Sequence, residues 1–490
     1  MLTVSSDSWT KDCEGHSRRD FLKVGALGLG GLTLPALLQA QAQASEAGSH
    51  IRNKSVVFLF LHGGASQIET WDPKMTAPSN IRSYTGEVQT KLPGVTFGGT
   101  FPRLAAMADK LAIVRSFRVG TGSHGTGRRL VATAGNDLEA PLGSIFARIA
   151  GTTHPTTGMP TNIALPPSSA GAEYNGLDGR IDMLENTGKL AREFRPFVPS
   201  SGPAAAANNN RRRRGRPAPS GGLLSDMQLR VPADRLDDRR ALLQQLSELQ
   251  QHVDQHEVAA ELGQYRQQAY NVILRGVSQA FDLSQEDPRV LARYDTSDLR
   301  IPQSVLNKGS RNARKIPQFE PTALGKQLLM ARRLCEAGCG FVTVTSHGWD
   351  MHGNALGIND GFPCLGPALD KAVSGFLEDL ESRGLSDDIL LVITGEMGRT
   401  PRINNKAGRD HWANLCSLAL AGGGLKMGQV IGASDRNAGT PATTPVTLDN
   451  LLATVMHTLF DVGQLRVTRG LPTEVVRMIN SAQPIRELFA

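Results

Sequence analysis

Three stretches of the chain are rich in the residue types that bind divalent cations. Each stretch follows a run of apolar residues and places carboxylates and imidazoles at short spacing. The residues are Glu69 and Asp72 in the first stretch, His347, Asp350 and His352 in the second, and Glu396, Asp410 and His411 in the third. Together such groups can hold one or two cations, which polarise a phosphoryl or sulfuryl oxygen and lower the pKa of a bound water or hydroxyl.

The apolar runs before these stretches have the length and composition of buried strands. We predict strands over 56–61, 111–117, 341–345 and 389–394, and helices over 324–334 and 369–380, where apolar residues recur at helical spacing. Strands that are apolar on both faces and alternate with helices indicate a mostly parallel α/β sheet with helices on both faces.

This arrangement determines where the candidate ligands should lie. In open α/β sheets, ligands bind beyond the carboxyl ends of the strands. A single Asp or His in a loop is more often a helix cap or a surface group than a ligand. Their joint placement after three predicted strands nevertheless predicts a metal site at one edge of the sheet.

The composition changes sharply in the middle of the chain. Residues 199–222 are almost entirely Ala, Asn, Arg, Pro, Ser and Gly, which predicts a disordered linker. Helical spacing at 234–285 indicates a helical insertion, to which we assign 223–320. We therefore expect the two halves of one α/β domain at 50–198 and 321–490.

The net charge does not indicate binding to nucleic acid. The formal charge is +7, but Arg211–Arg214 and Arg216 lie in the predicted linker, and subtracting these five charges leaves +2. A nearly neutral folded part lacks the basic surface that phosphates require, so we expect no nucleic-acid partner.

The N-terminal segment has the pattern of an export signal. Arg18 and Arg19 precede Phe21 and Leu22, a short Gly-rich apolar run covers 24–38, and small residues follow at 40–44. We predict a twin-arginine signal peptide over 1–44, read by the twin-arginine translocase of a bacterium, and a mature protein in the periplasm or secreted. No later apolar run is long enough for a transmembrane helix.

Several motifs resemble one bacterial family. The chain contains Gly-Trp-Asp-Met-His-Gly at 348–353, Gly-Glu-Met-Gly-Arg-Thr-Pro at 395–401 and Gly-Arg-Asp-His-Trp at 408–412. Together with 63–64, 69–74, 104–116, 421–424 and 484–488, these segments closely resemble the domain-of-unknown-function 1501 (DUF1501) family. The resemblance covers nearly everything after the signal except the linker.

That family is similar to the alkaline phosphatase and sulfatase superfamily, which implies a binuclear metal centre. By position, Glu69 or Asp72 would match the superfamily's first acidic ligand, Asp350 and His352 its middle pair, and Glu396 and His411 its late ligands. The ion would be Zn²⁺, Mn²⁺ or Ca²⁺.

The resemblance also indicates where a nucleophile would lie. The superfamily carries it at a helix N-terminus after the second strand, which corresponds to Ser123 or Thr126, with Arg128 near enough to bind an anionic group. The spacing does not match the Cys/Ser-x-Pro-x-Arg pattern of sulfatases, so formylglycine is not indicated. Either hydroxyl could instead only cap the helix.

These patterns favour a metal-dependent hydrolase of phosphate or sulfate esters acting on an anionic substrate. The alternative is a catalytically degenerate metal-binding or envelope-associated scaffold of the same fold. An α/β-hydrolase is disfavoured, because Thr121 stands where a nucleophile elbow needs Gly. The cysteines after the signal, which include no Cys-x-x-Cys, are expected to be buried thiols.

Overall fold

A computed structural model describes residues 50–175, 177, 186–199, 277–307, 313–468, 471, 473–481 and 483–489. The predicted signal peptide, nearly all of the predicted linker and the larger part of the predicted helical insertion lie outside these residues.

The fold is built on a seven-stranded sheet within the described residues, and the predicted fold class is confirmed. The strands lie in the order β11-β4-β10-β7-β1-β6-β5. Their bounds are β1 Ser55–Leu61, β4 Ala112–Val114, β5 Asn162–Leu165, β6 Phe341–Ser346, β7 Ile389–Thr394, β10 Leu418–Gly422 and β11 Gln429–Ile431. All are parallel except β10, which lies antiparallel between β7 and β4.

Strand β1 is apolar on both of its faces. Val57, Leu59 and Leu61 belong to one core cluster, whereas Val56, Phe58 and Phe60 belong to a second cluster on the opposite face. Successive side chains of a strand point to opposite faces, so both faces of β1 are buried in apolar cores. Strand β6 is buried on both faces as well but also carries Thr343 and Thr345.

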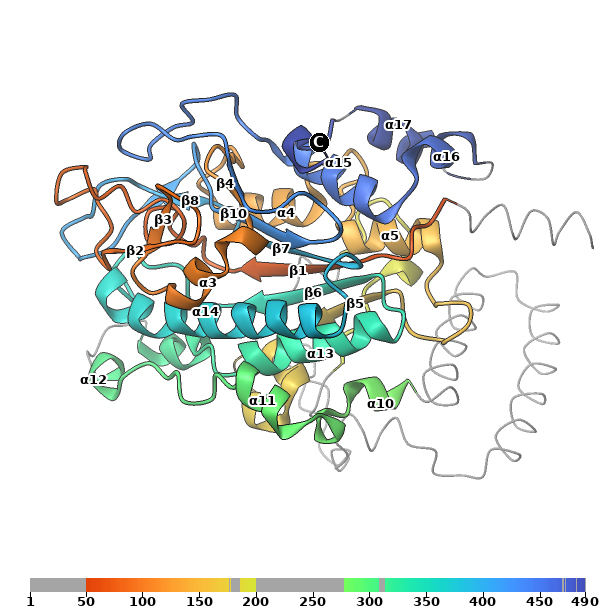
Figure 1. Cartoon of the computed structure of the whole chain (residues 1–490), viewed down its shortest axis with the longest axis horizontal. Coiled ribbons are helices and arrows are strands. Elements are labelled where there is room, and N and C mark those ends of the chain that lie inside the picture. The colour runs from red at the N-terminus through yellow and green to blue at the C-terminus, as the bar shows by residue number, and fades with distance from the viewer. Residues whose placement is uncertain are drawn as a thin grey trace, which may run out of the picture.

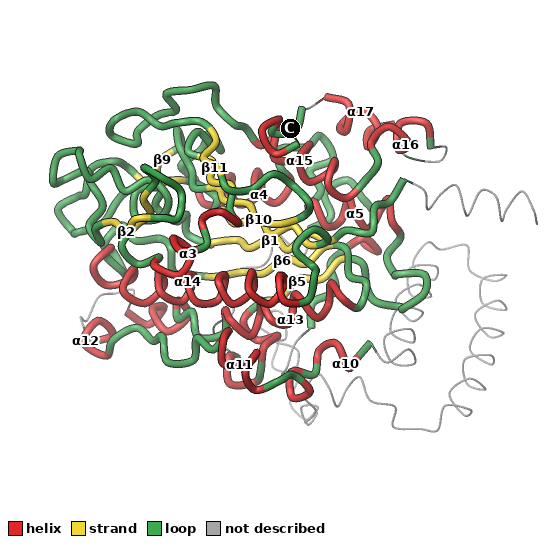
Figure 2. Tube along the Cα trace, viewed as in Figure 1, coloured by secondary structure: helices red, strands yellow, loops and turns green. Residues whose placement is uncertain are grey.

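Helices cover both faces of the sheet (Figures 1 and 2). One face carries α3 Pro102–Ala106, α11 Pro288–Tyr294, α13 Leu324–Glu336 and α14 Ile358–Ser382. The other carries α4 His124–Thr133, α5 Leu142–Ala150, α15 Leu448–Leu459, α16 Val462–Val467 and α17 Thr473–Ser481. The short helices α10 Ser278–Phe281 and α12 Gln303–Leu306 complete the described α-helices.

Smaller elements lie outside the central sheet. Two antiparallel pairs are formed by β2 Glu87–Gln89 with β3 Thr96–Gly98, and by β8 Gly398–Arg399 with β9 His411–Trp412. The 3₁₀ turns are η1 Ala108–Lys110, η2 Pro167–Ala170, η3 Ala172–Tyr174, η4 Arg192–Phe194, η5 Leu283–Gln285, η6 Ala313–Phe319 and η7 Arg486–Leu488.

The structure extends the predicted elements in two ways. Helix α14 begins at Ile358, well before the predicted 369, although Pro363 and Pro367 lie inside it. Most of its N-terminal half is buried, so tertiary packing outweighs the local cost of the prolines. Strands β5, β10 and β11 are too short to show a clear apolar period.

Two further expectations concern membranes and thiols. Within the described residues, no helix combines the length and the apolar character needed to cross a membrane. The four described cysteines, Cys335, Cys339, Cys364 and Cys416, are buried free thiols, as expected.

Candidate metal centre

The candidate site lies at the carboxyl edge of the sheet, where β1, β6 and β7 end. Asp350 follows β6 and Glu396 follows β7, while His62 to Gly64 follow β1. Strand β10 is antiparallel, so its first residue Leu418 pairs with the last residue of β7, and the segment before it, with His411, starts from the same edge. The structure thus brings residues of the second and third predicted stretches together beside the end of β1, as the parallel sheet requires.

Asp350 is the centre of the cluster. Its Oδ2 lies 3.2 Å from Nε2 of His124 and 3.1 Å from Nε2 of His352. Its Oδ1 lies 3.2 Å from Nε2 of His411 and accepts a 2.7 Å hydrogen bond from Nη2 of Arg399. One carboxylate therefore faces three imidazoles and one guanidinium.

His124 is held from behind by Glu396. Its Nδ1 lies 2.8 Å from Oε1 of Glu396, a fully buried carboxylate that also accepts 2.9 Å hydrogen bonds from the backbone N–H of Gly63. A carboxylate can only accept, so Nδ1 carries the proton and Nε2 is the atom turned toward Asp350. Histidines that bind metal ions typically donate their second N–H to a carboxylate in this way.

The electrostatics of the cluster follow from these contacts. Burial alone would lower the pKa of His124, but its hydrogen bonds to Asp350 and Glu396 outweigh burial and raise that pKa to about 9. Burial would raise the pKa of Asp350, but hydrogen bonds from His124, His352 and His411 hold it well below its usual range. A cation bound at Nε2 of His124 must displace a proton.

Glycines allow the loops to meet this closely. Gly63 has φ +115°, and a Cβ there would overlap the backbone nitrogen of Asp350. At Gly127, in the first turns of α4, a Cβ would lie 2.5 Å from the carbonyl oxygen of Glu396. The segments that carry Asp350, Glu396 and His124 are therefore in backbone contact.

A second group of polar side chains adjoins the cluster. Nη1 of Arg128 lies 3.0 Å from Nε2 of His62, whose ring centroid is 4.8 Å from that of His347. Burial lowers the pKa of His62, and it lowers the pKa of His347 to about 3. Both rings are thus neutral at pH 7, and the nearby positive charges are those of Arg128 and His124.

The donor set fits a divalent cation. One nitrogen each from His124 and His411 and one oxygen of Asp350 lie within 4.8 Å of one another. Ligand atoms about 2.0–2.1 Å from a tetrahedral Zn²⁺ are separated by roughly 3.3 Å. For comparison, His124 lies 3.2 Å from Oδ2 of Asp350 and His411 lies 3.2 Å from its Oδ1. His352 stands beside the same carboxylate and could serve as a further donor.

Two predicted ligands lie outside this cluster. Glu69 is fully buried in an ion pair with Arg409, with its Oε1 2.8 Å from Nη2. Asp72 pairs with Lys74 and Arg115 at 3.2 and 3.5 Å and accepts a hydrogen bond from Ser434. Both carboxylates thus have basic or hydroxyl partners of their own, and neither of them contacts an imidazole of the cluster.

Glu396 and Asp410 also differ from their predicted placement as ligands. Glu396 supports His124 rather than joining the group of convergent donor atoms. Asp410 is exposed, and its Oδ1 accepts a 2.9 Å hydrogen bond from the side chain of Asn404.

The predicted nucleophile segment forms the start of α4. Ser123 is the N-cap residue by position, but its exposed side chain makes no capping hydrogen bond. Thr126 is exposed and lies two residues from both His124 and Arg128, about 200° around the helix axis, so it is turned away from the cluster. Ser123 directly precedes His124 in the chain.

Sequence reasoning did not assign His124, Arg399 or His62 to the site. His124 lies within the predicted nucleophile segment, directly after Ser123, and Arg399 lies within a family motif. The sequence signal that could identify these residues is their position beside predicted site residues, as His124 beside Ser123. Their partners, however, lie more than forty-five residues away in the chain, where local spacing carries no information.

Fold and donor set together define an α/β protein with a candidate divalent-cation centre at the carboxyl edge of its sheet. The chain belongs to the family described as "Protein of unknown function (DUF1501)", whose model matches residues 53–489. The predicted family is thereby confirmed. The chain matches none of the curated proteins.

Three solved structures are similar over most of the chain. They are the PsFucS1 sulfatase from Pseudoalteromonas sp. (12% identity, 90% of this chain and 72% of that chain, TM-score 0.35), the lipoteichoic acid synthase LtaP from Listeria monocytogenes (9%, 86% and 78%, 0.32), and Ps i-CgsB in complex with k-i-k-neocarrahexaose (9%, 84% and 74%, 0.31). Similarities of this size do not identify an activity.

Proposed function

We propose that this protein is a metal-dependent hydrolase of phosphate or sulfate esters. The observation that supports this most is the convergence of His124, His411 and Asp350, with His124 oriented by the buried carboxylate of Glu396. A buried carboxylate behind an imidazole is the usual support of a metal-binding histidine.

The donor types favour particular ions. Imidazole nitrogens suit Zn²⁺, whereas Ca²⁺ is bound almost entirely by oxygen atoms. Two imidazoles, those of His124 and His411, and His352 as a possible third donor therefore favour Zn²⁺ over Mn²⁺ as the bound ion. Both of these ions are favoured over Ca²⁺. When bound, such an ion polarises an ester oxygen and lowers the pKa of a water or hydroxyl.

The chain's own residues around the centre suit an anionic ester. The guanidinium of Arg128 adjoins the cluster through His62, and Arg is the side chain best shaped to bind phosphate or sulfate oxygens. The exposed hydroxyl of Ser123 precedes His124 at the N-terminus of α4 and is not used as a cap. We propose Ser123 as the nucleophile and Arg128 as the substrate contact.

The test uses the mature chain, 45–490, purified without chelators. We expect bound divalent metal and release of p-nitrophenol from p-nitrophenyl phosphate or p-nitrophenyl sulfate, lost on chelation and restored by the ion. Asp350→Asn should lower metal content and hydrolysis together, whereas Asp387→Asn, an exposed position before the opposite end of β7, should change neither.

The outcomes separate the two readings of the site. A wild-type protein that neither carries nor gains Zn²⁺, Mn²⁺ or Ca²⁺ would contradict a metal-dependent activity. Bound metal without hydrolysis of either ester would favour the alternative, a catalytically degenerate metal-binding scaffold.

We further propose that the protein is exported by the twin-arginine translocase and acts in the periplasm or outside the cell. The support is the sequence of residues 1–44, above all Arg18 and Arg19. Changing both to Lys should leave the precursor in the cytoplasm, measured by cell fractionation. Unchanged export of that variant would refute the proposal.

A further inference from the structure

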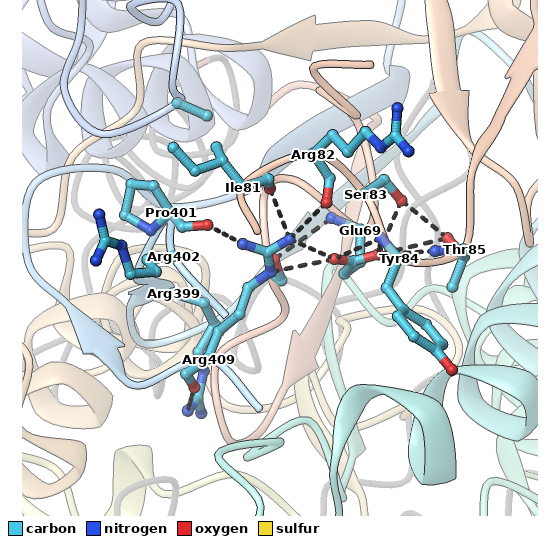
Figure 3. Close-up of polar contacts among 12 residues, drawn as sticks. Glu69, Ile81, Arg82, Ser83, Tyr84, Thr85, Arg399, Pro401, Arg402 and Arg409 are labelled. Atoms are coloured by element: carbon cyan, nitrogen blue, oxygen red, sulfur yellow. Dashed lines mark hydrogen bonds and ion pairs between the residues drawn. The ribbon is translucent and has the colours of Figure 1, made fainter. Parts of the chain in front are cut away.

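The buried carboxylate of Glu69 lies at the centre of a dense polar network (Figure 3). Its Oε1 accepts hydrogen bonds of 3.1 and 2.8 Å from Nε and Nη2 of Arg409. Its Oε2 accepts bonds of 2.8 Å from the Ser83 hydroxyl and 3.0 Å from the backbone N–H of Tyr84.

Arg409 joins several segments of backbone through the same guanidinium. Its Nη2 donates to the carbonyls of Ile81 and Arg82 at 2.8 and 3.1 Å, and its Nη1 donates to the carbonyl of Pro401 (Figure 3). Arg409 is fully buried. A buried guanidinium requires both a counter-charge and acceptors for its N–H groups, and this network supplies them.

The network connects directly to the candidate metal ligands. Arg409 lies two residues before His411, and His411 pairs with Arg399 in the β8–β9 ladder. Arg399 donates to the backbone carbonyl of Arg409 at 3.2 Å and to Oδ1 of Asp350 at 2.7 Å. The backbone N–H of Arg409 donates to the carbonyl of Met351, beside Asp350, at 3.0 Å.

We propose that Glu69 and Arg409 are positioning residues that determine how tightly the centre binds its cation. The proposal rests on the proposed function only in requiring that the centre binds a cation. The pair fixes the segment between Arg399 and His411, so that the imidazole of His411 and the carboxylate of Asp350 are held in place before the ion arrives. Loss of such outer support typically weakens metal binding about 10–100-fold.

A purely structural role is the competing explanation, and the chain offers a matched control for it. Arg332 and Asp379 form another buried ion pair, 2.9 Å long, between α13 and α14. The Tyr294 hydroxyl donates to Asp379 at 3.0 Å, as the Ser83 hydroxyl donates to Glu69. Neither Arg332 nor Asp379 contacts a residue of the metal cluster in the contacts of the described chain.

The experiment compares Glu69→Gln with Asp379→Asn, and Ser83→Ala with Tyr294→Phe. Each metal-stripped variant is titrated with Zn²⁺ by calorimetry at a temperature where circular dichroism shows it folded. The absorption spectrum of the Co²⁺-loaded protein then reports the ligand geometry. Both pairs of variants should lower the melting temperature, because each removes a partner of a buried charged group.

We expect Glu69→Gln to weaken Zn²⁺ binding about 10–100-fold and to change the Co²⁺ spectrum. Ser83→Ala should change both in the same direction by less. Asp379→Asn and Tyr294→Phe should stay within about twofold of the wild type, because distant sites rarely couple. If Glu69→Gln does not fold, the comparison of Ser83→Ala with Tyr294→Phe decides the matter.

Two results would overturn the inference. The first is a Zn²⁺ affinity that is the same in Glu69→Gln, in Ser83→Ala and in the wild type. The second is a loss of Zn²⁺ affinity that is as large in Asp379→Asn as in Glu69→Gln. If one of these two results is obtained while the wild type binds Zn²⁺ and hydrolyses the esters, only the positioning role fails. If the wild type binds no cation, the positioning role and the proposed function fail together.

Discussion

The two oxygens of Asp350 are shared among more partners than an ordinary surface carboxylate has. Three imidazole nitrogens and one guanidinium lie within 3.2 Å of them. Without a cation, this arrangement stabilises positive charge on His124, whose pKa rises to about 9. With a cation, the same geometry presents nitrogen and oxygen lone pairs to the ion, provided that the imidazoles are neutral.

Two adjacent residues allow the ligand set to be tested. His411→Ala removes one of the three convergent donors and should reduce bound metal at least about tenfold after dialysis. Asp410→Asn changes the neighbouring acidic group, which is exposed and hydrogen-bonded to Asn404, and should leave the metal content unchanged. Elemental analysis of both proteins measures this, and the opposite pattern would make Asp410 the ligand and contradict the cluster.

At the scale of elements, helix α4 carries two residues of the site, His124 and Arg128. His124 and Arg128 are four residues apart, so they lie on the same side of the helix, one turn from each other. Gly127 is buried between this helix and the segment after β7, which allows the backbone of Glu396 to approach. The close contact of α4 with the loop after β7 therefore depends on the absence of a side chain at Gly127.

Two glycines of α4 provide a matched pair of variants. In Gly127→Ala the new methyl group would lie 2.5 Å from the carbonyl of Glu396, a backbone atom that cannot move away alone. We expect this variant to lose about 1–3 kcal/mol of unfolding free energy. Gly125→Ala meets nothing within 4 Å and should gain up to about 1 kcal/mol from helix propensity. Urea denaturation distinguishes the two, and a similar change in both would refute the close contact.

At the scale of the whole molecule, one ion-pair network joins the described residues after the predicted linker to the helical layer. Glu286 pairs with Arg332, Arg333 and Arg383 at 2.6, 3.0 and 2.9 Å. Burial would raise the pKa of Glu286, but hydrogen bonds from Arg332 and Arg333 outweigh it, and the pKa is lowered from 4.5. The segment with α10 and α11 is thus held to α13 and α14 by charges as well as by apolar packing.

The lowered pKa determines the direction of a pH effect. A carboxyl group whose pKa is lowered by folding stabilises the protein at pH values above its unfolded-state pKa. That contribution is lost as the pH falls through the folded-state pKa. Glu286→Gln should therefore cost about 2 kcal/mol at pH 7, and the difference from the wild type should shrink below pH 4.5. Glu139→Gln, in an exposed pair with Arg129, should change stability by less than about 1 kcal/mol at any pH. A constant difference between wild type and Glu286→Gln from pH 7 to pH 3 would refute the assignment.

The sequence by itself determined the central strands, the sheet edge at which the site lies and the family. The runs at 56–61, 341–345 and 389–394 correspond to β1, β6 and β7, because burial on both faces leaves an apolar signature that local pattern can detect. The position of Asp350 at that edge follows from where a predicted strand ends, whereas His411 precedes the antiparallel strand β10, which the local pattern does not reveal. The export signal remains a prediction.

Only the tertiary structure decided what each polar residue does there. Glu69, Asp72 and Glu396 are all acidic residues that follow a predicted strand. In the structure Glu69 pairs with Arg409, Asp72 pairs with Lys74 and Arg115, and Glu396 orients His124. The partner of Glu69 is 340 residues away and that of Glu396 is 272 residues away. A carboxylate's role depends on which donors surround it, and donors this distant are brought together only by the folding of the chain.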